Sequence, residues 1–179
     1  MIDTLAIIKK YYTPGSLAYT SLVTHCKLVA QKAVYFARKH PELALDITFV
    51  EEAAMLHDIG IFLTNAPDIG CHGDKPYICH GYLGADLMRQ EGLPKHALVC
   101  ERHTGTGFTR ERIEQQGLPL PHRDMFPVTL EEKLITFADT FYSKSNLTQE
   151  KTPAQIRESL SRFGNEPVQH FEEWSRLFS

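Results

Sequence analysis

The sequence has 179 residues, of which 42% are hydrophobic and 23% charged, and its formal net charge is −3 at pH 7. A chain of this length can bury roughly 70% of its unfolded surface, so it folds without disulfides. The charge offers no basic face for a nucleic-acid polymer. No apolar run approaches the roughly 20 residues that a membrane-spanning helix needs. We therefore expect one domain over residues 1–179, with neither a nucleic-acid polymer nor a membrane as partner.

The N-terminal stretch MIDTLAIIKKYY lacks the long apolar segment of a secretion signal. The four cysteines are scattered and form no CxxC motif, so we expect reduced thiols at Cys26, Cys71, Cys79 and Cys100. These features predict a cytoplasmic protein, and they leave open whether it forms a homo-oligomer. Nine histidines are a weak indication of metal chemistry, because neutral imidazole is a common metal ligand.

Helical patterns dominate the whole chain. Capping boxes at Thr48-x-x-Glu51 and Thr129-x-x-Glu132, and Pro153 after Thr152, indicate where helices begin. No segment shows sustained period-two alternation, so no sheet is expected. The sequence predicts an all-α bundle, with helices over residues 3–12, 16–39, 48 to 57 or 61, 80–91, 95–102, 129–143, 152–164 and 167–178.

Two segments between these helices are expected to be irregular. Residues 64–79 are rich in Gly, Pro, Asn and Asp, and residues 104–128 contain the stretch LPLPH. Loops of more than about 15 residues are uncommon in a compact helical domain and usually form lids or binding loops. We expect these two loops to determine specificity.

The apolar segment EEAAMLHDIGIFL, residues 51–63, contains the polar doublet His57-Asp58. His57 follows Ala53 by four residues and Val50 by seven, so it shares their inward face. Asp58 is turned about 100° further round the helix. One interpretation is a solvated helix end. The other is a buried pair, which would cost several kcal/mol without a metal ion or a strong hydrogen-bond network.

Four more polar side chains have informative surroundings. His25 lies in the middle of an apolar stripe, where a core histidine is more common than a ligand, and Asp139 lies on the inner stripe of its helix. His80 opens a helix in which Gly84 permits close approach of another backbone. His103 ends a helix and enters the glycine-rich turn TGTG.

In their order and local context, these residues resemble the HD superfamily. The resemblance covers about residues 20–145 and rests on HDIG at 57–60, HGYLGADL at 80–87, ERHTGTG at 101–107 and LEEKLITFAD at 130–139. It implies an HD-domain helical bundle with a metal site between the central helices. Helices at about 152–178 would then pack on this core.

The resemblance also implies a ligand set for two divalent transition metal ions, with Fe, Mn or Zn suited to imidazole and carboxylate ligands. A first site would use His25, His57, Asp58 and Asp139, with Asp58 able to bridge. The extra pair, His80 and His103, would complete a second site, and Asp58, His80 and His103 would be catalytic. Many members lack this pair and hold one ion. Two ions about 3.5–4 Å apart can lower the pKa of a shared water towards ~7 and clamp phosphoryl oxygens.

These features favour a metal-dependent phosphohydrolase that acts on a small phosphorylated substrate, such as a phosphoester or nucleotide. Cyclic-dinucleotide phosphodiesterases carry Gly-Tyr-Pro where this chain has GTGFTR, and diadenosine tetraphosphate hydrolases lack the insert at 108–127. The insert resembles that of small stand-alone HD proteins of unassigned substrate. The alternative is a mixed-valent di-iron oxygenase, because HD oxygenases of inositol and hydroxyphosphonates use the same six ligands.

Five further residues are candidates for substrate binding, although a solvated surface or a simple turn is the more common role for each. Arg102 and Lys144 can contact a phosphate, and Thr104 can offer a backbone N–H group. Asp68 and His72 lie in the first loop and can line the pocket or transfer protons. The remaining histidines are predicted to lie on the surface, at His40, His96, His122 and His170.

Overall fold

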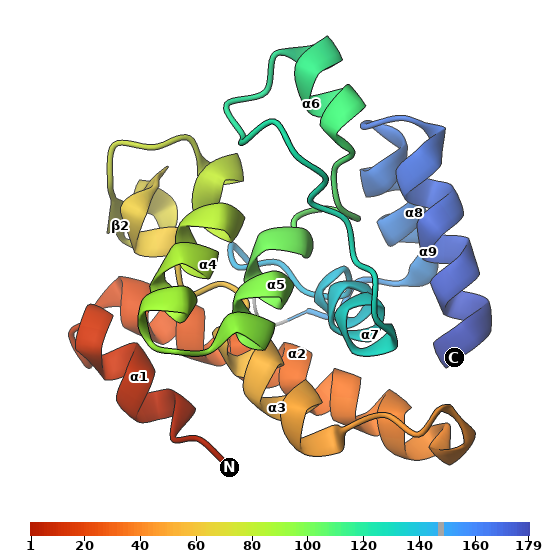
Figure 1. The fold of residues 1–179 in the computed structure, drawn as a ribbon, viewed down its shortest axis with the longest axis horizontal. Helices are drawn as coiled ribbons and strands as arrows, with labels where there is room; N and C mark the ends of the chain where they lie inside the picture. The colour runs from red at the N-terminus through yellow and green to blue at the C-terminus, as the bar shows by residue number, and fades with distance from the viewer. Residues whose placement is uncertain (147–148) are drawn as a thin grey trace.

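The computed structural model describes residues 1–146 and 149–179. Within these ranges the chain is all-α apart from one two-stranded sheet, as predicted from the sequence, and no helix there is both long and apolar enough to cross a membrane. The α-helices and strands (Figure 1) are α1 (Thr4–Tyr11), α2 (Leu17–Lys39), α3 (Ile47–Leu56), β1 (Asn65–Ala66), β2 (Cys71–His72), α4 (His80–Gln90), α5 (Pro94–Arg102), α6 (Arg110–Gln116), α7 (Leu130–Asp139), α8 (Pro153–Ser161) and α9 (Asn165–Phe178).

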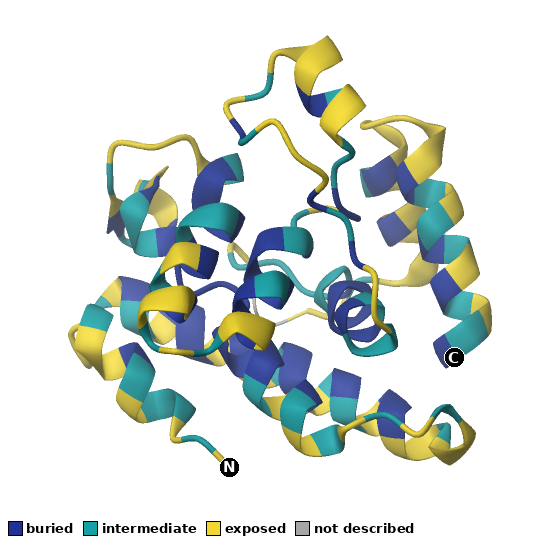
Figure 2. Cartoon of the chain, in the orientation of Figure 1, coloured by how far each residue is buried: buried dark blue, intermediate teal, exposed yellow. Residues whose placement is uncertain are grey.

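The central helices pack in pairs. Helix α2 lies along α3, α4 pairs with α5, and α7 contacts α2, α3 and α5. The faces that these helices turn towards one another are buried, whereas α6 is largely exposed (Figure 2). The middle of the bundle is therefore enclosed by helices from five separate parts of the chain.

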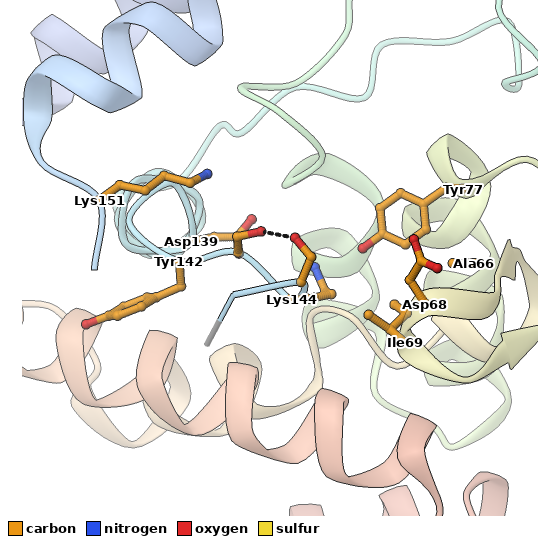
Figure 3. A pocket seen from close by; sticks show the side chains of 10 residues that line it. Ala66, Asp68, Ile69, Tyr77, Asp139, Tyr142, Lys144 and Lys151 are labelled. Carbon is orange, nitrogen blue, oxygen red and sulfur yellow. Dashed lines mark hydrogen bonds between the residues drawn. The ribbon is translucent and has the colours of Figure 1, made fainter. Parts of the chain in front are cut away.

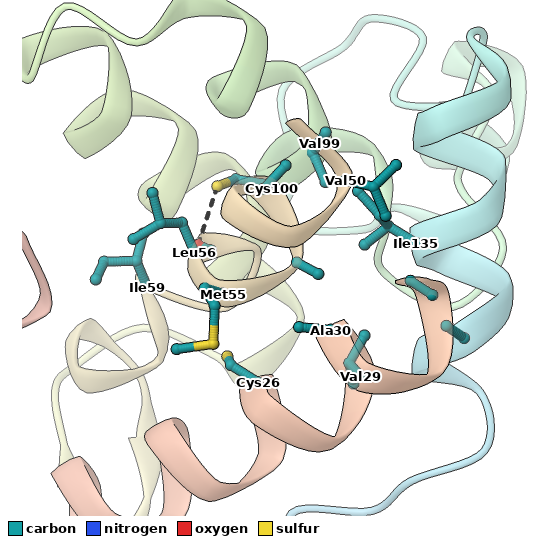
Figure 4. Close-up of a cluster of buried hydrophobic side chains, with 14 of the residues drawn as sticks. Cys26, Val29, Ala30, Val50, Met55, Leu56, Ile59, Val99, Cys100 and Ile135 are labelled. Carbon is teal, nitrogen blue, oxygen red and sulfur yellow. Dashed lines mark hydrogen bonds between the residues drawn. The ribbon is translucent and has the colours of Figure 1, made fainter. Parts of the chain in front are cut away.

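An apolar core fixes the spacing of these helices (Figure 4). Cys26 and Val29 of α2, Leu56 of α3 and Ile135 of α7 are fully buried in one cluster. The thiol of Cys100 in α5 donates a hydrogen bond to the Leu56 carbonyl, 3.3 Å away. Full burial of a large apolar side chain contributes about 1.5–3 kcal/mol. This cluster gives the polar side chains nearby a rigid frame.

Two glycines bring α4 against the turn that follows α3. A Cβ atom on Gly60 would collide with the carbonyl oxygen of His80 and would lie 2.5 Å from the backbone nitrogen of Gly84. A Cβ atom on Gly84 would lie 3.1 Å from the nitrogen of Gly60. The expectation that Gly84 permits close backbone approach is confirmed. The contact places the first residue of α4, His80, beside the His57-Asp58 doublet.

The C-terminal helices pack on this core, as the sequence suggested. The side chains of Phe171 and Phe178 in α9 are fully buried. Their rings lie 5.4 and 5.9 Å from the ring of Phe137 in α7, between centroids. Helix α8 begins with Pro153 after the N-cap Thr152, as predicted. One apolar cluster thus includes residues from both ends of the chain.

Two predicted helix boundaries are wrong. Helix α3 begins at Ile47, because the Asp46 carboxylate accepts the N–H of Phe49 at 3.0 Å and so acts as the cap in place of Thr48. Helix α7 does begin after Thr129, whose hydroxyl accepts the N–H of Glu132. It ends at Asp139, four residues before the predicted end.

Both predicted loops contain regular structure. In residues 64–79, β1 and β2 pair antiparallel, with Asn65 opposite His72, so the expectation of no sheet is wrong here. Two-residue strands are too short to show alternation. In residues 104–128, α6 forms between the N-cap Thr109 and Gly117, whose φ is 58°. Only Ile113 of α6 is buried, so the helix shows no apolar period.

The surface prediction is wrong for His96 and in part for His170. His96 is 8% exposed, its ring packs edge-on against Phe49, and its Nε2 lies 3.5 Å from a carboxylate oxygen of Glu52. Burial lowers the pKa of His96. His170 is half-buried and stacks on Trp174. The burial of His96 is not visible in the immediate sequence, because its partners belong to a different helix.

Candidate metal centre

Six polar side chains converge at the middle of the bundle. They come from the centre of α2, the turn after α3, the start of α4, the residue after α5 and the end of α7: His25, His57, Asp58, His80, His103 and Asp139. Their ligand atoms form two groups, each within 4.8 Å, and Asp58 belongs to both. The structure thus brings together all six residues that the sequence singled out.

The two carboxylate oxygens of Asp58 face different groups of histidines. Its Oδ2 lies 3.1 Å from Nε2 of His25 and 3.0 Å from Nε2 of His57. Its Oδ1 lies 3.2 Å from Nε2 of both His80 and His103. On the first side, Asp139 adds an oxygen 2.8 Å from Nε2 of His25. A carboxylate placed in this way can bridge two cations.

Three of the imidazoles are held by the same kind of hydrogen bond. Nδ1 of His57, His80 and His103 lies 2.7, 2.6 and 2.8 Å from the backbone carbonyl three residues earlier. Because a carbonyl only accepts, each Nδ1 carries the hydrogen and each Nε2 presents its lone pair to the centre. Nε2 atoms of His80 and His103 lie 3.1 Å apart. Two lone pairs this close require a shared proton or cation.

Buried polar atoms at the centre lack hydrogen bonds. Both oxygens of Asp58 and Nε2 of His25 and of His57 have no hydrogen-bond partner among the described residues. The Nε2 atoms of His57, His80 and His103 face the Asp58 oxygens with lone pairs, so they have no hydrogen to donate. Oδ2 of Asp58 keeps an ion pair with Lys144, and each buried group without any partner costs about 1–3 kcal/mol. His57 and Asp58 are fully buried, which excludes a solvated helix end. The arrangement fits a bound metal ion better than a hydrogen-bond network.

The charges at the centre also suit a cation. Burial disfavours ionised carboxylates, but His57 and Lys144 hold the pKa of Asp58 well below its usual range. Contacts with His25 and His57 outweigh burial in the same way and lower the pKa of Asp139. Burial likewise opposes charge on His57, yet Asp58 raises its pKa well above the usual value. A positive charge is therefore favoured here, either a proton or a metal ion.

A pocket of about 350 Å³ opens beside this centre (Figure 3). Its wall carries the cations of Lys144 and Lys151. Nζ of Lys144 lies 2.5 Å from Oδ2 of Asp58, and the side chain is 12% exposed. Burial opposes this charge, but Asp58 keeps the pKa of Lys144 well above its usual value. Other lining residues include Asp68, Tyr77, Asp139 and Tyr142.

The five candidate substrate-binding residues have different positions. Lys144 and Asp68 line the pocket beside the metal centre, and Thr104 lines a second, apolar pocket. Nη1 of Arg102 lies 3.0 Å from both carboxylate oxygens of Glu132. His72 is exposed on β2. Among the described residues, neither Arg102 nor His72 lines either pocket.

Three lining residues escaped the sequence analysis. Tyr77 supplies the carbonyl that orients His80, and its ring lies 4.7 Å from that imidazole, between centroids. Its position three residues before His80 is the signal that could have revealed it. Tyr142 lies three residues after Asp139 and so carries a comparable signal, whereas Lys151 carries none, because only the tertiary fold brings it to the pocket.

The fold and the histidine–aspartate cluster define a helical domain able to hold metal ions. A family model described as "HD domain" matches residues 22–143. The chain belongs to the HD domain family, whose members bind divalent metal ions and include metal-dependent phosphohydrolases. It is 37% identical over 127 residues to the uncharacterized protein MJ0778 of Methanocaldococcus jannaschii. This match covers 69% of this chain and 68% of that protein.

Two further relatives are named tRNA (cytidine(56)-2'-O)-methyltransferase. The protein of Thermoplasma volcanium is 32% identical over 142 residues, and that of Picrophilus torridus is 31% identical over 127 residues. The matches cover 79% and 70% of this chain but only 37% and 33% of those proteins. This chain therefore corresponds to about a third of each.

A solved structure has the same fold. It is the HD domain of the L. monocytogenes phosphodiesterase PgpH, with a TM-score of 0.57 and 16% sequence identity. The likeness covers 97% of this chain and 95% of that one. It therefore extends to the C-terminal helices, beyond the residues that the family model matches.

Proposed function

We propose that this protein is a phosphohydrolase that uses two divalent metal ions to cleave a small phosphoester or nucleotide. The observation that carries the proposal is the position of Asp58, whose two oxygens face two separate groups of donors. Two lysines on the adjoining pocket wall favour an anionic substrate. The name of the PgpH structure, a phosphodiesterase, agrees with this chemistry for that protein.

Metal ions at such a centre lower the pKa of water and offset charge on phosphoryl oxygens. The residues of the chain contribute position and charge. Asp58 joins the two donor groups, and the backbone carbonyls keep His80 and His103 oriented, so these three side chains are the proposed catalytic residues. The ammonium groups of Lys144 and Lys151 would bind phosphate oxygens at the pocket wall.

We do not extend methyltransferase activity to this chain, because it corresponds to only about a third of the relatives with that name. Four features of the protein stay predictions, namely the choice among Fe, Mn and Zn, the presence of two ions rather than one, a cytoplasmic location and self-association. Of these, the number of ions follows most directly from the geometry, since each oxygen of Asp58 has its own set of histidines.

The test combines metal analysis with activity. Protein purified without chelator or added metal should contain about two equivalents of a redox-silent ion, such as Mn or Zn, by mass spectrometry. It should also hydrolyse members of a phosphoester panel. Asp58→Ala should lose both the metal and the turnover. His122→Ala is the matched control, because His122 is exposed on the insert. Equal metal content in the two variants would refute the site.

The oxygenase alternative is tested on the same sample by EPR. Two equivalents of iron with a mixed-valent signal and substrate-dependent O₂ consumption would replace the hydrolase proposal. A single ion that survives substitution of both His80 and His103 would instead refute the second site. A metal-loaded protein that cleaves no phosphoester in a broad panel would count against hydrolysis itself.

A further inference from the structure

A second, apolar pocket lies on the other side of Tyr77 from the lysines. It has a volume of about 260 Å³ and lies between the TGTG turn, α6 and the C-terminal helices. Its lining includes Tyr77, Ile78, Phe108, Leu160, Phe163 and Pro167. Drug-sized ligands occupy roughly 300–1,000 Å³, so this pocket suits a single ring system.

The apolar pocket adjoins the lysine-bearing pocket beside the candidate metal centre. Tyr77 lines both this pocket and the lysine-bearing one, and its ring packs on His80. Thr104 and Gly105, which directly follow His103, form part of the wall. Tyr77 and the segment after His103 thus bring the apolar pocket next to the candidate metal centre.

The wall is built for a flat ring. Phe163 is 65% exposed and lines the pocket, so its ring is accessible to a ligand. The guanidinium group of Arg112 lies 5.2 Å from the ring centroid of Phe108 and donates a hydrogen bond to the Phe163 carbonyl at 3.1 Å. Aromatic rings and guanidinium planes both stack on nucleobases in a way that tolerates different bases.

We propose that the apolar pocket binds the base of a nucleotide whose phosphate is cleaved at the metal centre. This inference rests on the proposed function and narrows its substrate class from small phosphoesters to nucleotides. Phe163 and Leu160 are then specificity-determining residues, and both lie outside residues 22–143, where the family model matches. Part of the proposed ring-binding wall thus lies outside the segment that carries the six cluster residues, whereas Phe108 and Arg112 lie within it.

The first experiment measures nucleoside binding, because nucleosides carry no phosphate and cannot be hydrolysed here. Adenosine, guanosine, cytidine and uridine are titrated into the purified protein by calorimetry, with ribose as the reference. At least one nucleoside should bind about 5- to 100-fold more tightly than ribose, the range expected of base stacking. If none of the four binds more tightly than ribose, the proposal is wrong.

The variant Phe163→Ala tests whether the base binds in the apolar pocket. It removes an exposed ring, so the fold should tolerate it, and it should abolish most of the preference for the nucleoside. Tyr35→Ala is the matched control, because Tyr35 is 61% exposed on α2 and lines neither pocket among the described residues. A preference that persists in Phe163→Ala would place the base elsewhere and overturn the proposal.

Hydrolysis separates this inference from the proposed function. Nucleoside 5′-monophosphates and ribose 5-phosphate are compared as substrates of the metal-loaded protein, and the nucleotide should have the lower KM. If neither is hydrolysed but nucleoside binding depends on Phe163, the hydrolase proposal fails and the pocket assignment stands. If ribose 5-phosphate is hydrolysed with the same KM as every nucleotide, the pocket assignment fails and the hydrolase proposal stands.

Discussion

Lys144 forms an ion pair with Asp58, a carboxylate that is also a proposed metal ligand. Its ammonium group lies 2.5 Å from Oδ2 of Asp58, the same oxygen that faces His25 and His57. A cation so close to the centre lowers the affinity for metal ions, yet it strengthens the attraction for a phosphate in the pocket. This position of Lys144 is favourable where the gain in affinity for an anionic substrate exceeds the loss of affinity for metal ions.

Replacing Lys144 should therefore separate substrate binding from metal binding. In Lys144→Met, we expect metal content to stay at the wild-type level and the KM for a phosphoester to rise about tenfold, the loss of one charge-assisted contact. Metal analysis and steady-state kinetics on the same preparation check both. Lys39→Met, at the exposed end of α2, is the control. If the variant lost metal as well as activity, Lys144 would instead be required to maintain the metal cluster.

At the scale of elements, the backbone contact between Gly60 and Gly84 determines where α4 lies. The φ of Gly60 is −84° and its ψ is −1°, which alanine can adopt, so only the neighbouring backbone opposes a side chain there. Gly84 has more room, since its nearest contact would be 3.1 Å away. The two positions therefore differ in steric cost and not in backbone strain.

Gly60→Ala should push α4 away from the doublet. We expect a loss of about 1–3 kcal/mol in the free energy of unfolding, as for overpacked cores, and weaker metal binding at the His80 side. Gly84→Ala should cost less, because alanine's higher helix propensity offsets part of the clash. Chemical denaturation and metal titration of both variants provide the comparison. If the two substitutions changed stability and metal binding equally, the expected difference in steric cost between the two positions would be wrong.

The elements that could be predicted from sequence are those whose signals are local. Helix α2 shows a long apolar stripe, and α8 has Pro153 after its cap. The polar helix α6 and the two-residue strands have no such pattern. The cluster residues were found because their motifs occur in a known order. Lys151 was missed, because its place at the pocket depends on contacts between distant segments.

At the scale of the whole molecule, the metal centre joins helices that are far apart in sequence. Its proposed ligands come from α2, the turn after α3, the start of α4, the residue after α5 and the end of α7. An ion bound to residues from all of these elements stabilises only the folded state, because the unfolded chain holds no such site.

Removal of metal should therefore lower the melting temperature. At a free metal concentration about 100 times the Kd, binding contributes about 2.7 kcal/mol, which corresponds to a shift of about 5–10 °C for a chain of this size. Differential scanning fluorimetry with and without chelator measures the shift, and added Mn or Zn should reverse it. Asp58→Ala should melt at one temperature under both conditions. A chelator-insensitive wild-type protein would show that no ion is bound.

Part of the wall of the apolar pocket lies outside the segment that carries the six cluster residues, and this has an evolutionary consequence. All six cluster residues lie within residues 22–143, whereas Leu160, Phe163 and Pro167 lie beyond them. Mutations in the C-terminal helices can reshape this part of the pocket while the six cluster residues stay intact. In the proposed hydrolase, lineages that inherit the same cluster can then acquire different substrates by exchanging the two helices at its C-terminal side.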